Sequence, residues 1–170
     1  EAIFRGEVTA PQAIKMRAII KADFVDFGLG RLPVTIADSI DTNIEFPSLT
    51  TVDDIAVTFN QFPFWEKNVD INGARNYMSD RVALVEQQAE KRQIIITETG
   101  WADSGTNAES NPANPASMAK WLREFVCLAD SRKWKYFWFT AFNLDWRRFN
   151  GTADAESNDV EGHFGKSNRN

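Results

Sequence analysis

The sequence has very little of the chemistry that depends on thiols or imidazoles. Its 170 residues include one cysteine, Cys127, and one histidine, His163. A single cysteine excludes a disulfide within the chain. Because Cys127 lies in an apolar helical pattern, we expect it in the core. One histidine nearly excludes a histidine-based triad or metal cluster, so we interpret His163 as a packing or surface residue.

Long apolar runs and an excess of positive charge are also missing. No apolar stretch approaches the roughly 20 residues that a membrane-spanning helix needs. The formal net charge is −5, whereas nucleic-acid binding requires a basic face. We therefore expect no membrane and no nucleic acid among the partners. Hydrophobic residues make up 43% and charged residues 25% of the chain, which is typical of one folded globular domain.

Tyrosine is scarce, with 2 residues, but the chain has 6 tryptophans and 13 phenylalanines. Three of the tryptophans, Trp65, Trp101 and Trp146, fall in or beside predicted loops. Indole rings in loops are candidate sugar-binding platforms, because the C–H faces of pyranose rings stack on them. For each tryptophan taken alone, ordinary packing is the more frequent explanation.

Helical and strand patterns alternate along the chain. A capping box at Thr9 and Gln12 predicts the start of the first helix, and Asn114 and Pro115 predict the start of the last. The predicted helices cover 9–29, 72–91 and 115–132, and the predicted strands cover 32–38, 53–62, 92–98 and 135–142. Such alternation predicts an α/β fold with parallel strands.

A carboxylate ends the most apolar of these strands. In the stretch QIIITETGW, residues 93–101, Glu98 follows three isoleucines and precedes the turn signal Thr99-Gly100. In α/β folds the carboxyl ends of the strands carry the chemistry. A glutamate that only caps the next loop fits this position equally well.

Polar or aromatic residues follow all four predicted strands, in the segments ADSID, NQFPFW, ETGW and NLDWRR. An open sheet gathers its site at one switch point, whereas a (β/α)8 barrel draws residues from every strand end. The pattern therefore favours a (β/α)8 TIM barrel. Acidic residues also cluster in the segments DSID, VDD and DAESND. Their spacing fits no EF-hand pattern, so we expect solvated loops at these segments rather than a calcium site.

Five segments, in order, resemble the signature segments of glycoside hydrolase family 17. They are EAIFRGEVT, NQFPFW, ITETGW, FTAFNLDWR and VEGHFG, and they run from residue 1 to about residue 165. This family contains β-1,3-glucanases and β-1,3-glucanosyltransferases. The resemblance implies a TIM-barrel glycosidase that acts on β-1,3-glucan without a cofactor or metal. It also implies a secreted or cell-wall protein that is monomeric at full length.

The resemblance assigns the catalytic roles residue by residue. Glu1 matches the general acid/base that ends the fourth barrel strand, and Glu98 matches the nucleophile that ends the seventh. Hydrolysis with retention needs two such carboxyls about 5 to 5.5 Å apart. Glu7 is a less favoured candidate for the acid, because it lies at the entry to a helix. The choices between hydrolysis and transfer, and between endo and exo action, stay open.

The expected substrate-binding residues are Asn60, Phe62, Trp65, Trp101, Trp146, Arg147 and Glu161. Phe62 lacks the hydrogen-bonding group that the family usually has at this position, and Leu144 stands where the family often has a glutamate. These departures leave a second hypothesis open, namely a catalytically silent glucan-binding or cell-wall protein on the same scaffold.

The family match begins at the end of the fourth of eight barrel strands. We therefore expect residues 1–170 to form the C-terminal half of one catalytic barrel, with an open sheet and exposed apolar side chains. In such a fragment we expect little to fix the position of Glu1.

Overall fold

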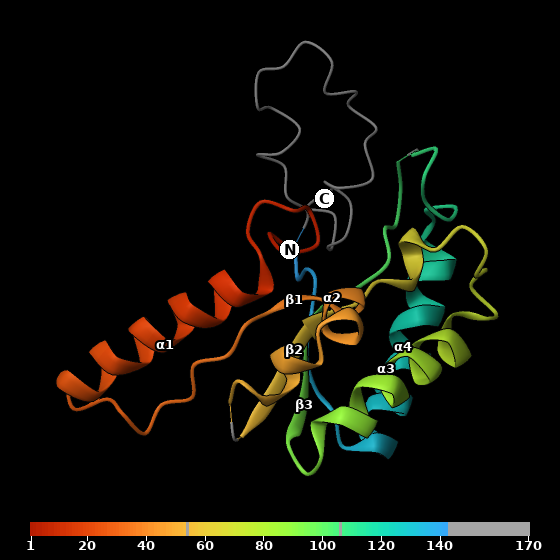
Figure 1. Cartoon of the computed structure of the whole chain (residues 1–170). Helices are drawn as coiled ribbons and strands as arrows, with labels where there is room; N and C mark the ends of the chain where they lie inside the picture. The colour runs from red at the N-terminus through yellow and green to blue at the C-terminus, as the bar shows by residue number, and fades with distance from the viewer. Residues whose placement is uncertain (54, 106, 143–170) are drawn as a thin grey trace. The chain divides into compact units, whose positions relative to one another are not determined.

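The structure is a computed structural model that describes residues 1–53, 55–105 and 107–142. In chain order its elements are α1 (Ala10–Asp26), β1 (Asp38–Ser39), α2 (Ile40–Glu45), η1 (Pro47–Thr51), β2 (Ala56–Asn60), η2 (Pro63–Trp65), α3 (Ala74–Ala89), β3 (Gln93–Thr99), α4 (Pro115–Arg132) and β4 (Lys135–Trp138) (Figure 1). The strands form one sheet in the order β1-β2-β3-β4, and β1 pairs parallel with β2. The predicted α/β class with a parallel sheet is confirmed.

The chain divides into two compact units. The first contains residues 1–61, 80–97 and 133–136, and the second contains residues 62–79, 98–132 and the described residues from 137 onward. Fully buried side chains of the first unit include Ile40, Val57, Phe59, Val82, Val85 and Ile96. Those of the second unit include Phe64, Met78, Trp101, Trp121 and Phe125. Each unit therefore has an apolar core of its own.

The helix starts follow the capping signals in the sequence. The backbone N–H of Thr9 donates to Gln12 Oε1 at 2.8 Å, and the Gln12 N–H donates to Thr9 Oγ1 at 3.4 Å, which completes the capping box of α1. Asn114 Oδ1 accepts from the N–H of Ser117 at 2.8 Å, and α4 begins at Pro115. Both predicted starts are confirmed.

The predicted strand at 32–38 is mostly wrong, because β1 contains only Asp38 and Ser39. Two carbonyls before β1 are engaged by side chains instead of by a neighbouring strand. Arg17 Nε donates to the carbonyl of Val34 at 2.7 Å, and Thr58 Oγ1 donates to that of Ile36 at 3.0 Å. These bonds satisfy the Val34 and Ile36 carbonyls outside the ladder.

The prediction that Cys127 lies in the core is wrong, since it is exposed. Helix α4 buries Trp121, Phe125, Leu128 and Ala129. This spacing of i, i+4, i+7 and i+8 defines one inward stripe, and Cys127 lies outside it. In α3, Val82, Val85 and Ala89 are buried, whereas Tyr77 is only half-buried.

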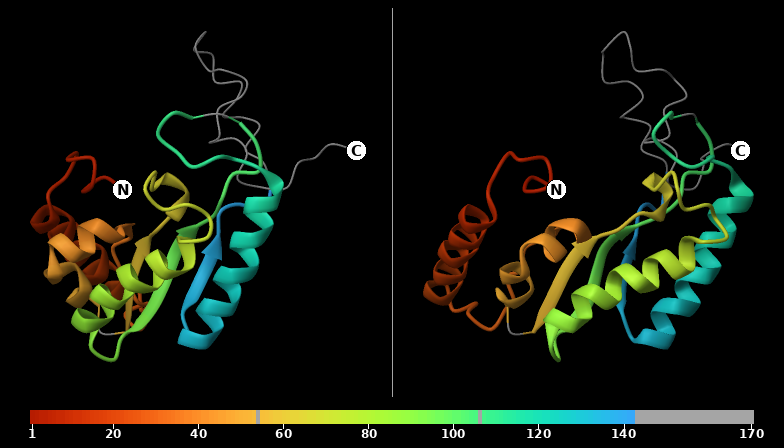
Figure 2. Two further views of the ribbon diagram at one scale, coloured as in Figure 1. Left: turned by 90° about the vertical axis from the view of Figure 1, so that its right-hand side faces the viewer. Right: turned by 45° about the vertical axis from the view of Figure 1, so that its right-hand side comes forward.

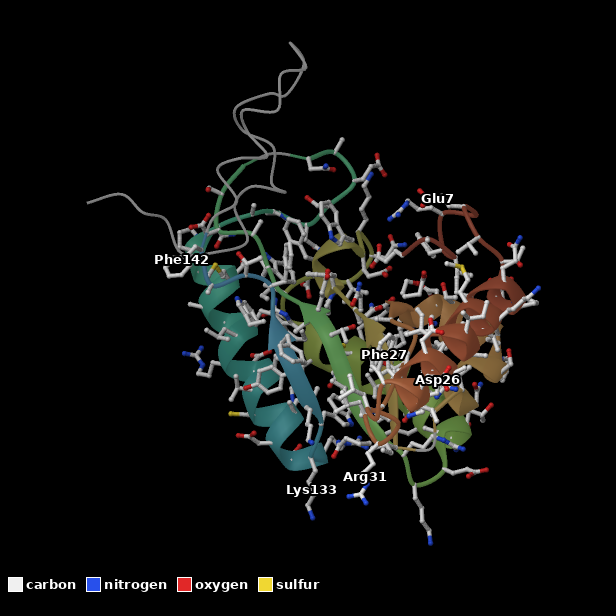
Figure 3. All side chains as sticks on the ribbon, turned by 90° about the vertical axis from the view of Figure 1, so that its left-hand side faces the viewer. Glu7, Asp26, Phe27, Arg31, Lys133 and Phe142 are labelled. Atoms are coloured by element: carbon white, nitrogen blue, oxygen red, sulfur yellow. The ribbon has the colours of Figure 1, made fainter. Side chains whose placement is uncertain are left out.

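Helix α1 keeps most of its apolar side chains in solvent. Met16, Ile19 and Val25 are each more than half exposed, and Ala10 is its only buried residue. Phe27, just after the helix, is 80% exposed (Figure 3). Exposed apolar side chains thus occur on α1, whereas the sequence analysis expected them at the edge strand of an open sheet. Among the helices that the structure describes, none combines the length and apolar character needed to cross a bilayer.

Candidate active site

The short strand β1 holds the first residues of the chain through Asp38. This aspartate is 2% exposed, and its Oδ2 and Oδ1 accept from the backbone N–H groups of Ile3 at 2.9 Å and Phe4 at 3.1 Å. It also accepts from the N–H of Ser39 and from the hydroxyl of Thr42, both at 2.8 Å. Residues near Glu1 are therefore fixed by a buried anion, so the expectation that little fixes Glu1 is wrong.

Hydrogen bonding sets the ionisation of Asp38. Burial raises the pKa of this carboxyl, but the bonds from the N–H groups of Ser39 and Ile3 and the Thr42 hydroxyl outweigh it. The net effect lowers the pKa of Asp38 below its usual value, so the side chain is a carboxylate at neutral pH.

The carboxyl end of β2 presents Asn60 to Glu1. Asn60 is 8% exposed, and its Nδ2 donates to Glu1 Oε1 at 3.4 Å. Its Oδ1 accepts from the hydroxyl of Thr97 at 2.6 Å. An ionised carboxylate only accepts, so the NH2 end of the Asn60 amide faces Glu1, and the Thr97 hydroxyl holds the oxygen end. Thr97 lies in β3, the strand beside β2 (Figure 2).

The end of β3 places Glu98 as the sequence predicts. Ile94 and Ile96 are buried, and Glu98 is half-buried two residues beyond Ile96. The carbonyl of Thr99 accepts from the N–H of Phe139 at 2.8 Å, which ties the strand end to the segment after β4. Glu98 therefore lies on a strand end whose backbone is hydrogen-bonded on its C-terminal side.

Aromatic side chains fill the space behind the loop after β2. Phe64 is fully buried and meets Trp65 and Trp101 edge-on, with ring centroids 4.9 and 5.3 Å apart. Trp101 is 1% exposed, and its indole N–H donates to the carbonyl of Pro112 at 3.2 Å. Because a stacking platform must expose a ring face, this burial speaks against the expected sugar-binding role of Trp101. Trp65 is half-buried and keeps that role as a prediction.

Asn111 clamps the loop that carries Trp65. Its Nδ2 lies 2.9 to 3.2 Å from the backbone carbonyl oxygens of Pro63, Phe64, Glu66 and Val69. The N–H of Asn111 also donates to the carbonyl of Phe64 at 2.8 Å. Sequence reasoning missed Asn111, since nothing local marks an asparagine whose partners lie more than 40 residues away.

Other predicted site residues are placed differently. Phe62 is half-buried, and its ring meets Phe139 edge-on with centroids 6.0 Å apart. Glu7 binds Arg5 through both carboxylate oxygens on the segment before α1 (Figure 3). The predicted residues Trp146, Arg147 and Glu161, together with His163, lie outside the described residues. Within the described part of the chain, no group of three acidic, histidine or cysteine side chains could hold a metal.

Comparison with known proteins identifies the family. The chain is 28% identical over 111 residues to a glucan 1,3-beta-glucosidase of Schizosaccharomyces pombe, a match that covers 62% of this chain and 32% of that protein. It is 32% identical over 117 residues to a protein of the same name from Saccharomyces cerevisiae, covering 64% of this chain and 35% of the other. The chain thus spans about a third of the length of these curated relatives.

A solved structure matches the fold over nearly the whole chain. An active-site mutant of Rhizomucor miehei β-1,3-glucanosyltransferase in complex with laminaritriose superposes with a TM-score of 0.79 at 24% identity. The match covers 99% of this chain and 57% of that structure. The model of the BtgE/BtgC glycoside hydrolase domain matches residues 1–165. The chain therefore belongs to the BtgE/BtgC glycoside hydrolase domain family.

Proposed function

We propose that the protein is a retaining glycoside hydrolase of β-1,3-glucan, with Glu98 as the nucleophile and Glu1 as the general acid/base. The hydrogen-bonded series Thr97–Asn60–Glu1 is the observation that carries this proposal. It holds the Glu1 carboxylate against the end of β2, and it starts from the residue directly before Glu98 in β3. The names of the relatives, glucan 1,3-beta-glucosidase and β-1,3-glucanosyltransferase, support the substrate class.

The chemistry is a double displacement. In the first step the Glu98 carboxylate attacks the anomeric carbon, the glycosidic C–O bond breaks, and Glu1 gives its proton to the leaving oxygen. In the second step Glu1 takes a proton from water, whose oxygen attacks the same carbon and releases Glu98. A sugar hydroxyl in place of that water gives transfer instead of hydrolysis. Laminari-oligosaccharide products longer than the substrate would identify transfer.

The remaining predicted residues complete the glucan site in this proposal. Asn60 orients the acid/base, and Trp65 and Trp146 supply stacking faces for glucose rings. Arg147 and Glu161 frame the nucleophile electrostatically, and Phe62 offers the substrate an apolar surface. Trp101 supports the loop from behind, as its burial indicates. The location that goes with this substrate is the cell wall or the extracellular space.

The 170 residues form the C-terminal half of a (β/α)8 barrel in this proposal. The sheet has four strands among the described residues, and the chain covers 57% of the solved relative. Apolar side chains also stay exposed in α1, at Met16 and Ile19, and in β4, at Phe137. A barrel of eight strands would cover such surfaces.

The Glu98→Gln variant tests the proposal. With laminari-oligosaccharides, the full-length variant should lose turnover by several orders of magnitude while its glucan affinity stays close to that of the wild type. Glu45→Gln, which changes an exposed glutamate at the end of α2, is the matched control and should keep turnover. NMR of the product that the wild-type protein forms first should show the retained anomer. Wild-type-like turnover in Glu98→Gln, or an inverted first product, would refute the mechanism.

The same experiment distinguishes the rival hypothesis. Phe62 packs edge-on against Phe139 and has no hydrogen-bonding group to offer a sugar. A catalytically silent glucan-binding protein would keep glucan affinity in the wild type and show no turnover at all. That result would replace the enzymatic proposal with the binding one.

A further inference from the structure

We propose that Asp38 is a positioning residue for Glu1, holding by its carboxylate the backbone that carries the acid/base side chain. This inference rests on the proposed role of Glu1. The contacts of Asp38 with the start of the chain are to backbone, including the Glu1 nitrogen at 3.8 Å, so its proposed effect on the reaction passes through Glu1.

The first observation is the use of both carboxylate oxygens. Oδ2 accepts from the N–H of Ile3 at 2.9 Å, and Oδ1 accepts from the N–H of Phe4 at 3.1 Å. Residues 1–8 form neither helix nor strand, and their own turns are closed by local backbone bonds such as Arg5 N–H to Glu1 carbonyl at 3.1 Å. Asp38, more than 30 residues away, therefore joins this turn to the sheet.

The second observation is that Asp38 is itself fixed. It is 2% exposed and lies in β1 opposite Phe59 of β2. The N–H of Ser39 and the hydroxyl of Thr42 each donate to Oδ1 at 2.8 Å. Four donors surround this side chain, so both of its terminal atoms must accept hydrogen bonds. Both oxygens of an ionised carboxylate can accept, whereas an amide has only one accepting oxygen. Replacing it with asparagine would set an NH2 group against a backbone N–H.

The third observation is a division of tasks around Glu1. Asn60 donates to the Glu1 side chain at 3.4 Å, whereas Asp38 holds the backbone two and three residues further along. The two anchors lie at the ends of neighbouring strands, β1 and β2. Asn60 thus holds the side chain of Glu1 and Asp38 holds the backbone beside it. Loss of Asp38 should shift the Glu1 carboxyl without freeing it from Asn60.

A displaced acid affects substrates unequally. A sugar leaving group needs the proton from Glu1, whereas a dinitrophenolate leaves without it. A misplacement of about 1 Å can cost about 100-fold in a positioned step. Loss of Asp38 should therefore lower kcat/KM for an oligosaccharide and spare kcat/KM for its dinitrophenyl glycoside. It should also slow the second step, in which Glu1 acts as a base, and azide should relieve that step because it attacks without a base.

The experiment compares Asp38→Asn with Asp53→Asn in the full-length protein. Asp53 is a matched control, since it is 4% exposed and accepts from the backbone N–H of Ile55 at 2.8 Å, but it precedes β2 at the end remote from Asn60. For Asp38→Asn we expect a loss of about 10-fold or more in kcat/KM for laminari-oligosaccharides. The dinitrophenyl glycoside should keep its kcat/KM within about threefold, and azide should raise its kcat and yield the β-glycosyl azide. Asp53→Asn should show neither substrate discrimination nor azide acceleration.

Two further variants separate the possible failures. Thr42→Val removes one hydrogen bond from Asp38 but keeps its carboxylate, so it should fold if Asp38→Asn does not and should show the same pattern at smaller amplitude. Glu1→Gln should show the full pattern. Suppose that Glu1→Gln shows this pattern, while Asp38→Asn and Thr42→Val lower kcat/KM equally for the oligosaccharide and for the dinitrophenyl glycoside. The positioning role is then refuted and the proposed function stands. Wild-type kinetics in Glu1→Gln would refute both.

Discussion

The hydroxyl of Thr97 donates a 2.6 Å hydrogen bond to Oδ1 of Asn60, the same amide whose Nδ2 donates to Glu1. An amide has two ends of similar shape, so packing alone does not choose between them. An ionised Glu1 carboxylate only accepts, so it takes the NH2 end at 3.4 Å, and the Thr97 hydroxyl, which can donate, satisfies the oxygen end. A residue with no proposed contact to the sugar thus anchors the amide that binds Glu1.

Thr97→Val should uncouple this arrangement. Valine keeps the shape but removes the donor, which leaves Asn60 Oδ1 buried without its partner at a cost of about 1 to 3 kcal/mol. We expect a lower free energy of unfolding by that amount, measured by chemical denaturation, together with a lower kcat. Thr97→Ser keeps the hydroxyl and should retain most of the activity. Equal activity in the valine and serine variants would show that the bond does not orient Asn60.

The stability of the first unit should fall at acidic pH. Burial raises the pKa of Asp38 and Asp53, but hydrogen bonds outweigh it, so both pKa values are lower in the folded chain than in the unfolded one. The unfolded chain then binds more protons, and this stabilisation, complete above about pH 4 to 5, is lost as pH falls through the folded values. Urea unfolding of the full-length protein from pH 7 to pH 3 measures it.

The matched variants make the pH experiment specific. Asp38→Asn and Asp53→Asn should each be less stable at pH 7 and should each show a shallower acid dependence than the wild type, because one titrating group is gone. An unchanged slope in both variants would mean that other carboxylates control acid unfolding.

Asn111→Asp should be more harmful than Asn111→Ala. Aspartate keeps the size but sets a negative charge against four carbonyl oxygens, whereas alanine only removes the two N–H donors, worth about 2 kcal/mol together. Because the clamped loop carries Trp65, KM for laminari-oligosaccharides should rise more than kcat falls. Asn114→Ala is the control: it removes the bond to the N–H of Ser117 that caps α4, costs about 1 kcal/mol and should leave KM unchanged.

An isolated chain of residues 1–170 should behave as half of a fold. With Met16, Ile19, Val25 and Phe137 more than half exposed, it should bind a hydrophobic dye and aggregate. Co-expression with the upstream half of the proposed barrel should suppress both and restore glucan turnover. A monomeric, cooperatively unfolding chain of 170 residues without dye binding would contradict the half-barrel proposal.

Local signals were enough to predict most elements. The capping box at Thr9 and Gln12 and the proline at position 115 act within one turn of a helix, and α1 and α4 begin where these signals predict. The strand before Asp38 was predicted too long because its carbonyls bind the side chains of Arg17 and Thr58. Such bonds depend on the folded arrangement and have no signature in a local pattern.

The candidate site shows the same limit. The end of an apolar strand indicated Glu98, and the resemblance indicated Glu1. The supports Asp38 and Asn111 were not assigned, because their partners are 34 to 48 residues away in sequence. The burial of Trp101 was also missed, since an aromatic residue in a loop looks the same in sequence whether it faces sugar or core.

The Asn111 clamp has a consequence for how this protein can diverge. All four of its acceptors are backbone carbonyls, which every amino acid provides. The conformation of the loop from 63 to 69 is therefore largely independent of the side chains that the loop displays. Substitutions at Trp65 or Lys67 can accumulate, and with them new preferences for glucan branching or length, while the loop keeps its shape. The loop is a natural place for a library that alters specificity without loss of folding.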